Sequence, residues 1–172
     1  MLLLKMIQKL IATLNSDGTP GQVAAGIALG SALGLTPLVN LHNLLVFAVV
    51  FVFNVSFPAA ILGWMLFTPV GFLLDPLFDT IGLALLVDSP GLVPTWTAFY
   101  NMPVMPLSNY NNTVVLGSFL AWIVLAIPIF FLARLGVGRY REHVLPRLEK
   151  MKVFKAVKAS KLYNLYRLFR PE

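Results

Sequence analysis

Two aspartates inside a long apolar stretch are the first candidates for chemistry in this sequence. Asp75 and Asp79 are four residues apart, a spacing that places both on one face of a helix. Ionisable side chains in a membrane-like environment are costly and by default functional, so the pair predicts a path for a small solute or ion. A structural role is the open alternative: Pro76 would break the helix, and Asp75 or Asp79 would cap the piece that follows.

A second polar group surrounds an expected turn, residues 36–40, between apolar segments at 20–35 and 41–56. Its favoured role is a buried hydrogen-bond network of Asn40, His42, Asn43 and Asn54. A break is also predicted at Thr68-Pro69, in the third apolar stretch. The polar and hinge positions expected at membrane depth are therefore Thr36, Pro37, Asn40, His42, Asn43, Thr68, Pro69, Asp75 and Asp79.

Enzymatic chemistry has little support in these residues. No histidine lies near a plausible serine nucleophile, and neither a P-loop nor a dinucleotide-binding fingerprint is present. A metal site would need more ligands than His42 supplies, and His143 lies far along the chain. The absence of cysteine excludes disulfides and thiolate chemistry. We therefore expect no enzyme, no cofactor and no metal.

The composition is that of a membrane protein. Hydrophobic residues make up 58% of the 172 residues and charged residues 12%, whereas soluble domains carry about 25% charged residues. No Lys or Arg occurs between Lys9 and Arg134. The apolar residues occur in runs without the two-residue alternation of a β-barrel. The sequence thus predicts an all-α integral membrane protein with one compact domain.

Residues 16–87 are predicted to form a membrane core of short or broken helices, after an amphipathic interfacial helix at 1–15. Each of the segments at 20–35 and 41–56 would be about 24 Å long, shorter than the ~30 Å hydrocarbon core of a bilayer. The sequence does not decide whether these two helices cross as a thin pair or return as a re-entrant hairpin.

Glycines recur in this predicted core at helical spacing. Gly26, Gly30 and Gly34 are separated by four residues each, and Gly63 lies in the next apolar stretch. Such a stripe lets two helix backbones approach closely. Helix packing is the favoured role of these glycines, and a contact face for a partner or a lipid tail is the alternative.

Residues 88–113 are expected to form an interfacial loop, because prolines alternate there with aromatic residues that favour the headgroup level. Aromatic side chains beside amides also suit a protein interface. The predicted partner-binding residues are Trp96, Tyr100, Asn101, Tyr110, Asn111 and Asn112. The alternative for Asn111 and Asn112 is a cap on the helix that follows.

One long transmembrane helix is expected at residues 114–134, where Pro128 would introduce a kink. A basic, amphipathic tail follows at 135–172. Anionic lipid headgroups fit this tail better than nucleic acid, because it directly follows the membrane stop. The expected lipid contacts are Arg139, Arg141, Arg147, Lys150, Lys152, Lys155, Lys158 and Lys161.

The distribution of basic residues predicts the orientation. Both ends of the chain are basic, and residues 88–113 contain neither Lys nor Arg. Because loops rich in Lys and Arg stay in the cytoplasm, both termini are expected there, with residues 88–113 on the periplasmic side of a bacterial inner membrane.

Two runs of residues carry a family resemblance. They are Gly26-Ile27-Ala28-Leu29-Gly30 with Gly34-Leu35-Thr36-Pro37, and Thr95-Trp96-Thr97-Ala98-Phe99-Tyr100-Asn101-Met102-Pro103 with Pro106 and Asn111-Asn112-Thr113-Val114-Val115-Leu116-Gly117. The first resembles the bacterial membrane family catalogued as domain of unknown function 2062. The second is similar to a subgroup of small envelope proteins, whose members tend to be encoded beside a much larger envelope protein. Thr68-Pro69 departs from the Asn-Pro that is frequent in the wider family.

The resemblance implies a two-component assembly. We therefore expect a small inner-membrane subunit that anchors a large periplasmic envelope protein and works with it in envelope maintenance, with lipid transfer as a further hypothesis. The second hypothesis is a transporter or channel for a small solute or ion, with Asp75 and Asp79 in its path. Membrane lipids are expected partners in either case, and a homo-oligomer stays open.

Overall fold

The computed structural model describes residues 18–53 and 55–149, and every regular element in these ranges is helical. The predicted all-α fold is confirmed in this coarse form. The α-helices are α2 (Pro20–Leu35), α3 (Leu41–Val52), α4 (Phe57–Leu86), α5 (Val93–Tyr100), α6 (Thr113–Arg139) and α7 (Leu145–Glu149). The shorter elements are the 3-10 turns η1 (Pro90–Leu92) and η2 (Met105–Ser108) and the π-helical turn η3 (Tyr140–Val144). The helix predicted at 1–15 and the tail from 150 onward lie outside the described residues.

Local sequence accounts for where α2 begins and ends. Thr19 Oγ1 accepts a hydrogen bond from the Gln22 backbone N–H at 3.2 Å, and Gln22 Oε1 accepts one from the Thr19 N–H at 2.7 Å. Pro20 takes the first helical position, where its missing N–H is not needed. Pro37 disfavours a helical conformation at Thr36, which is extended and ends the helix.

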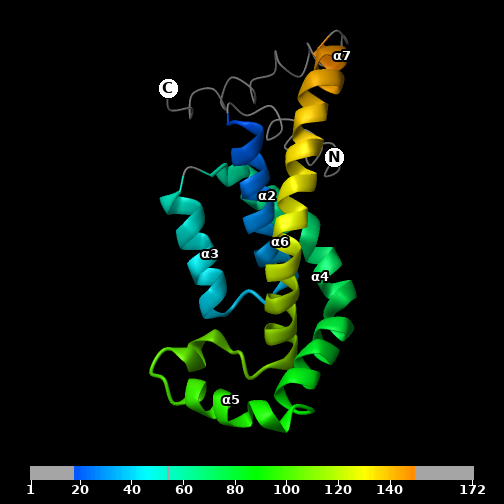
Figure 1. The fold of residues 1–172 in the computed structure, drawn as a ribbon. Helices are drawn as coiled ribbons and strands as arrows, with labels where there is room; N and C mark the ends of the chain where they lie inside the picture. Colours follow the sequence, from blue (N-terminus) through cyan, green and yellow to red (C-terminus); the bar gives the residue numbers. More distant parts are fainter. Residues whose placement is uncertain (1–17, 54, 150–172) are drawn as a thin grey trace.

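Helices α2, α4 and α6 pack against one another, while α3 returns beside α2 (Figure 1). The start of α2 and the end of α6 lie at one end of the bundle. The turn between α2 and α3 lies toward the opposite end, and α5 lies across that opposite end. Arg141 Nη1 donates to the Gly18 carbonyl oxygen at 2.7 Å, which joins the two chain segments at the first end. We call this the basic end, after Arg139, Arg141 and Arg147, and the opposite one the α5 end.

Glycines let these helices touch backbone to backbone. A Cβ atom at Gly30 would lie 1.9 Å from the carbonyl oxygen of Ala60, and one at Gly117 would lie 1.9 Å from that of Phe78. No side chain larger than hydrogen fits at these distances, so α4 packs tightly on α2 and then on α6. We call these two lines of backbone contact the glycine seams. Further glycines along them are Gly26, Gly34, Gly63, Gly71 and Gly82.

Helix α4 is continuous over 30 residues, so the predicted break at Thr68-Pro69 is wrong, as is a break at Pro76. The Thr68 hydroxyl donates to the Trp64 carbonyl oxygen at 2.7 Å, and the Thr80 hydroxyl to that of Pro76 at 2.9 Å. A proline inside a helix costs about 3 kcal/mol when nothing compensates. Here α4 contacts α2 and α6 along its length, and these contacts hold the helix together through both prolines.

Two described helices are long and apolar enough to cross a membrane, namely Phe57–Leu86 and the continuous Thr113–Arg147. The prediction of a single long helix at 114–134 is therefore wrong in two respects. The described residues contain two such helices, and the second extends beyond residue 134 to Arg147. Arg134 ends the apolar stretch without ending the helix, because arginine is a good helix former. Large apolar side chains stay exposed on both helices, such as Leu73 at 82% and Val124 at 71%.

The segment predicted as an interfacial loop contains three helical pieces, η1, α5 and η2. Pro90, Pro94 and Pro106 each lie at the first or second position of one piece. A proline there costs no hydrogen bond, and its fixed φ favours the helical turn. Residues 90–112 thus form a short helical layer across the α5 end, which we call the α5 layer.

Candidate functional site

The α5 layer is held together by three aromatic rings. Trp96 and Tyr110 lie with their ring centroids 5.8 Å apart, and Phe99 packs edge-on against each, at 6.0 and 6.3 Å. All three side chains are half-buried. Aromatic pairs in such arrangements contribute about 0.5–1.5 kcal/mol beyond the area they bury. The predicted partner-binding residues Trp96 and Tyr110 therefore belong to the interior of this layer.

Hydrogen bonds fix the same aromatic cluster to the bundle. Trp96 Nε1 donates to the Leu85 carbonyl oxygen, near the end of α4, at 2.9 Å. The Tyr110 hydroxyl donates to the Trp96 carbonyl oxygen at 2.7 Å. Desolvation and the neighbouring Tyr100 raise the pKa of Tyr110 above its ordinary value of 10.0. The layer is thus a positioned element rather than a loose connection.

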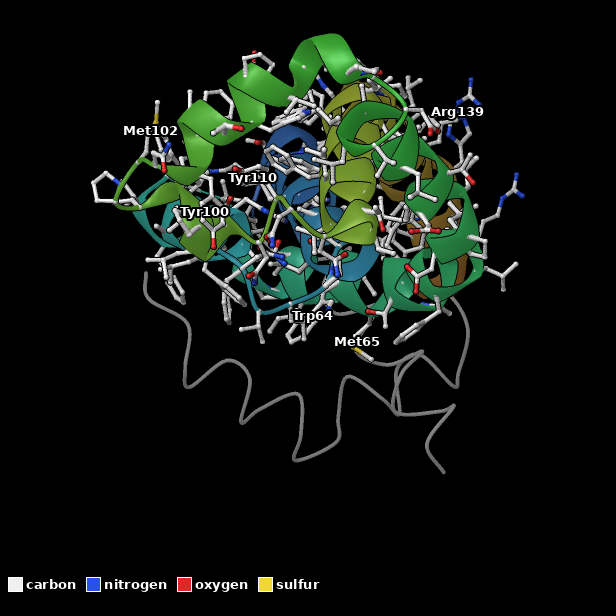
Figure 2. All side chains as sticks on the ribbon, turned by 90° about the horizontal axis from the view of Figure 1, so that it is seen from below. Trp64, Met65, Tyr100, Met102, Tyr110 and Arg139 are labelled. Carbon is white, nitrogen blue, oxygen red and sulfur yellow. The ribbon has the colours of Figure 1, made fainter. Side chains whose placement is uncertain are left out.

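The other predicted partner-binding residues lie on the outside of the layer. Tyr100 is 58% exposed, and Asn101, Asn111 and Asn112 are also exposed. Figure 2 views this end from below and shows Met102 at the rim and Tyr110 nearer the middle. Asn112 has a second role, because its Oδ1 accepts from the Val115 N–H at 3.1 Å and caps α6. Exposed apolar neighbours are Val93, Met102, Val104, Met105 and Leu107.

Asn109 connects the layer to the α2–α3 turn and was not among the predicted site residues. Its backbone is left-handed, with φ 54° and ψ 26°, a conformation that asparagine tolerates better than other side chains. Its Nδ2 donates to the Val39 carbonyl oxygen at 2.8 Å. The run Ser108-Asn109-Tyr110 contained the signal, since asparagine is favoured wherever a turn needs positive φ.

The turn between α2 and α3 is built from the polar side chains predicted there. Asn40 Oδ1 accepts from the Asn43 N–H at 2.9 Å, and Asn43 Nδ2 donates to the Pro37 carbonyl oxygen at 2.8 Å. The Thr36 hydroxyl can donate either to Ala32 O, at 2.8 Å, or to Asn43 Oδ1, at 3.0 Å. This network pairs the buried side chains of Thr36, Asn40 and Asn43 with one another and with the backbone of the turn, as buried polar groups require.

His42 lies next to this network without joining it. Its ring lies against Phe119 of α6, with the centroids 4.5 Å apart. Its Nε2 is buried and has no hydrogen-bond partner among the described residues. No group of three or more His, Asp or Glu side chains in the described part of the chain could hold a metal ion. Asn54, the last member of the predicted network, lies outside the described residues.

The two aspartates lie half-buried within continuous α4. Neither caps a following piece of that helix, because no break separates Pro76 from its neighbours. Asp79 Oδ1 instead accepts a hydrogen bond from the Thr113 hydroxyl, at the first residue of α6. The contact lies beside the seam of Gly82 and Thr113. Asp79 thus connects the two long helices close to the α5 end.

The predicted lipid-contact residues that are described lie at the basic end. Arg139 and Arg147 are exposed, and Arg141 is half-buried where it reaches Gly18. The lysines from Lys150 onward lie outside the described residues. The basic end and the α5 layer therefore face opposite ways along the bundle (Figure 1).

The described residues define an all-helical protein with two apolar helices of membrane-spanning length and a helical layer across one end. The chain belongs to the bacterial family catalogued as domain of unknown function 2062, described as an uncharacterised protein conserved in bacteria, whose model matches residues 4–145. The predicted resemblance to this family is confirmed. A protein of Treponema pallidum (strain Nichols), described as an uncharacterised protein, is 29% identical over 152 residues, which cover 88% of this chain and 93% of the relative. No solved structure matches the chain.

Proposed function

We propose that this chain is a small subunit of the bacterial inner membrane that anchors a large envelope protein through the α5 layer. The exposed apolar side chains along α4 and α6 would face lipid, since water disfavours a contiguous surface of this kind. With Arg139 and Arg147 on the cytoplasmic side, the α5 layer faces the periplasm. Both termini are then cytoplasmic.

One observation carries the docking proposal: some side chains of the α5 layer are bonded within it, and others are exposed on its surface. Trp96 and Tyr110 are fixed from within. Tyr100 and Asn111 are exposed on the same layer. A surface that is already ordered loses little conformational entropy when a partner binds, which favours affinity. Interfaces are enriched in aromatic residues and depleted in Lys, and residues 90–112 contain no Lys.

The nature of the partner is taken from the resemblance to the subgroup of small envelope proteins, whose members tend to be encoded beside a much larger envelope protein. Lipid exchange between the membrane and that partner is the second part of the proposal. Helix α3 is about 18 Å long at ~1.5 Å per residue, shorter than the ~30 Å hydrocarbon core. Leu44, Leu45 and Phe51 are exposed along it. A short apolar hairpin of this kind would thin the bilayer locally and ease the movement of a lipid.

A transporter for a small solute or ion is the second candidate. Its supporting observation is the half-buried position of Asp75 and Asp79 within an apolar helix. Carboxylates at membrane depth frequently line transport paths. The two candidates differ in what a purified chain does alone: a transporter moves its solute in vesicles, whereas a subunit requires its large partner.

Co-purification in mild detergent tests the proposal. The tagged chain should retain a large envelope protein, and Tyr100→Ala with Asn111→Ala should reduce the retained amount more than about tenfold, because interface anchors dominate binding energy. Phe72→Ala with Leu73→Ala is the matched control, since these exposed side chains lie on α4. Trp96 is unsuitable for this test because its indole holds the layer itself. Unchanged retention in the Tyr100 and Asn111 variant would rule out the α5 layer as the docking surface.

A further inference from the structure

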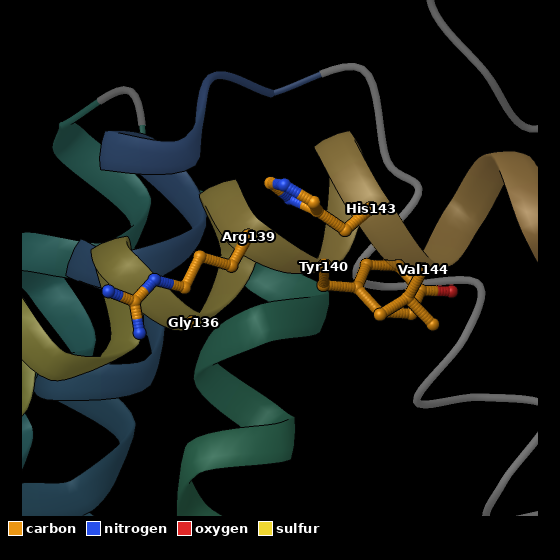
Figure 3. Close-up of a pocket in the computed structure, with 5 residues that line it drawn as sticks. All are labelled: Gly136, Arg139, Tyr140, His143 and Val144. Atoms are coloured by element: carbon orange, nitrogen blue, oxygen red, sulfur yellow. The ribbon is translucent and has the colours of Figure 1, made fainter.

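A shallow hollow lies at the basic end, where α6 passes into the π-helical turn η3. Its volume is about 440 Å³, and Figure 3 shows the residues that line it, Gly136, Arg139, Tyr140, His143 and Val144. A π-helical turn inserts one extra residue into a helix and often occurs at functional sites. The hollow is open to the outside of the bundle rather than enclosed within it.

One side of the hollow is apolar. Gly136, Tyr140 and Val144 recur at every fourth position, and Leu132, one turn earlier, is 69% exposed. A Cβ atom at Gly136 would meet nothing within 4 Å. The glycine therefore leaves room beside the helix, and the strip continues along α6 toward the apolar part of the molecule. Apolar surface of this kind is favoured in contact with a hydrocarbon chain rather than with water.

The other side of the hollow is cationic. In the view of Figure 3, Arg139 and His143 extend to one side of the helix and Tyr140 and Val144 to the other. Arg139 is exposed, and no carboxylate among the described residues forms an ion pair with it. His143 Nδ1 lies 3.9 Å from Glu142 Oε2. A guanidinium presents its donors in a fork that matches a phosphate, and an imidazole N–H adds a further donor.

We propose that this hollow binds one anionic phospholipid, with its phosphate on Arg139 and His143 and the start of one acyl chain on the strip of Leu132, Gly136 and Tyr140. The inference rests on the membrane insertion and orientation proposed above, which place the basic end at the cytoplasmic headgroups. It goes beyond diffuse attraction of a basic tail to a charged surface, because it requires one particular arginine and one particular glycine.

Native mass spectrometry of the full chain in a neutral detergent tests the site, with dioleoyl phosphatidylglycerol as the probe. Wild type should retain one lipid. Arg139→Gln should weaken its binding at least about fivefold, which is the loss expected for one cation near an anionic headgroup. Gly136→Leu should weaken it similarly, because a Cβ at this position meets nothing within 4 Å and the new side chain occupies the space of the strip.

Two matched variants separate this site from general effects. Arg147→Gln removes the same charge at an exposed position outside the hollow, and Gly138→Leu adds the same side chain where a Cβ also meets nothing within 4 Å. Both should bind the lipid like wild type. Equal losses in Arg147→Gln and Arg139→Gln would overturn the proposal in favour of a net-charge effect.

Two further arms identify the ligand. Dioleoyl phosphatidylcholine should be retained more weakly than phosphatidylglycerol, and inorganic phosphate should not displace the bound lipid. Displacement by phosphate, or equal retention of the zwitterionic lipid, would each overturn an anionic phospholipid site. Extraction of membranes at alkaline pH reports insertion separately: a chain that stays in the membrane but retains no lipid fails only this proposal, and one that is extracted fails the proposed function as well.

Discussion

The side-chain amide of Asn109 donates a hydrogen bond to the Val39 carbonyl oxygen at 2.8 Å, across 70 positions of the sequence. This bond connects the tip of the α2–α3 hairpin to the α5 layer. Val39 is 87% exposed, so little else covers the tip. The contact places the hairpin and the proposed docking surface at the same end of the molecule.

Replacing Asn109 should loosen the hairpin tip in two distinguishable steps. Asn109→Gly keeps the left-handed backbone and loses the amide, so it should destabilise by about 1 kcal/mol. Asn109→Ala adds the strain of a left-handed side chain, about 1 kcal/mol more. Thermal unfolding in detergent measures both, and hydrogen exchange at residues 38–41 should rise in each variant. Asn111→Gly is the exposed control, and the same loss there would contradict a specific role for Asn109.

Glycine substitutions should divide sharply by position. Gly30→Ala and Gly117→Ala each bring a Cβ to 1.9 Å from a carbonyl oxygen, so the helices must separate, at a cost of at least about 2 kcal/mol. Gly138→Ala meets open space and should stabilise α6 by about 0.5–1 kcal/mol through helix propensity. Unfolding in detergent compares all three. A mild effect of Gly30→Ala would mean that α2 and α4 lie farther apart than described.

Substitutions at the aspartates should separate structure from transport. Asp79→Asn keeps an oxygen that accepts from the Thr113 hydroxyl, whereas Asp79→Leu loses it at a cost of about 1–3 kcal/mol. The double variant Asp75→Asn with Asp79→Asn should therefore fold and still retain the large envelope protein. Stability in detergent and co-purification are the readouts. A folded double variant that binds the partner but fails to rescue a deletion strain would favour the transporter.

Single cysteines should report the orientation, because the chain has no native cysteine. Asn111 and Arg147 are both exposed and lie at opposite ends of the bundle. Asn111→Cys should react with an impermeant maleimide on intact spheroplasts, and Arg147→Cys only after lysis. The reverse labelling would place the α5 layer in the cytoplasm and remove its proposed periplasmic partner.

Several features could be predicted because their causes are local. Thr19 and Pro20 start α2 through contacts within one turn, and Asn112 caps α6 in the same way. The helical class follows from long apolar runs whose backbone groups must be satisfied within the segment. The polar residues of the α2–α3 turn bond within seven positions of one another, so their grouping was visible in the sequence.

The continuity of α4 was decided by tertiary structure. Proline at 69 and 76 is a strong local signal for a break, and the sequence offers no measure of what opposes it. The opposing contacts come from glycine seams with α2 and α6, such as Gly30 on Ala60 and Gly117 on Phe78, whose partners are distant in sequence. The local preference of proline for a helix break is outweighed by helix packing, because the glycine seams run along both halves of α4.

The division within the α5 layer also depended on the fold. By residue type alone, Trp96, Tyr100 and Tyr110 are equivalent aromatic candidates for a partner. Trp96 is held inside because Leu85 of α4 offers a carbonyl acceptor, and Tyr110 because it reaches Trp96. The sequence determined that a cation-free aromatic segment lies at one end of an apolar helical protein. Which of its rings face outward was decided by acceptors that only the packed helices bring within reach.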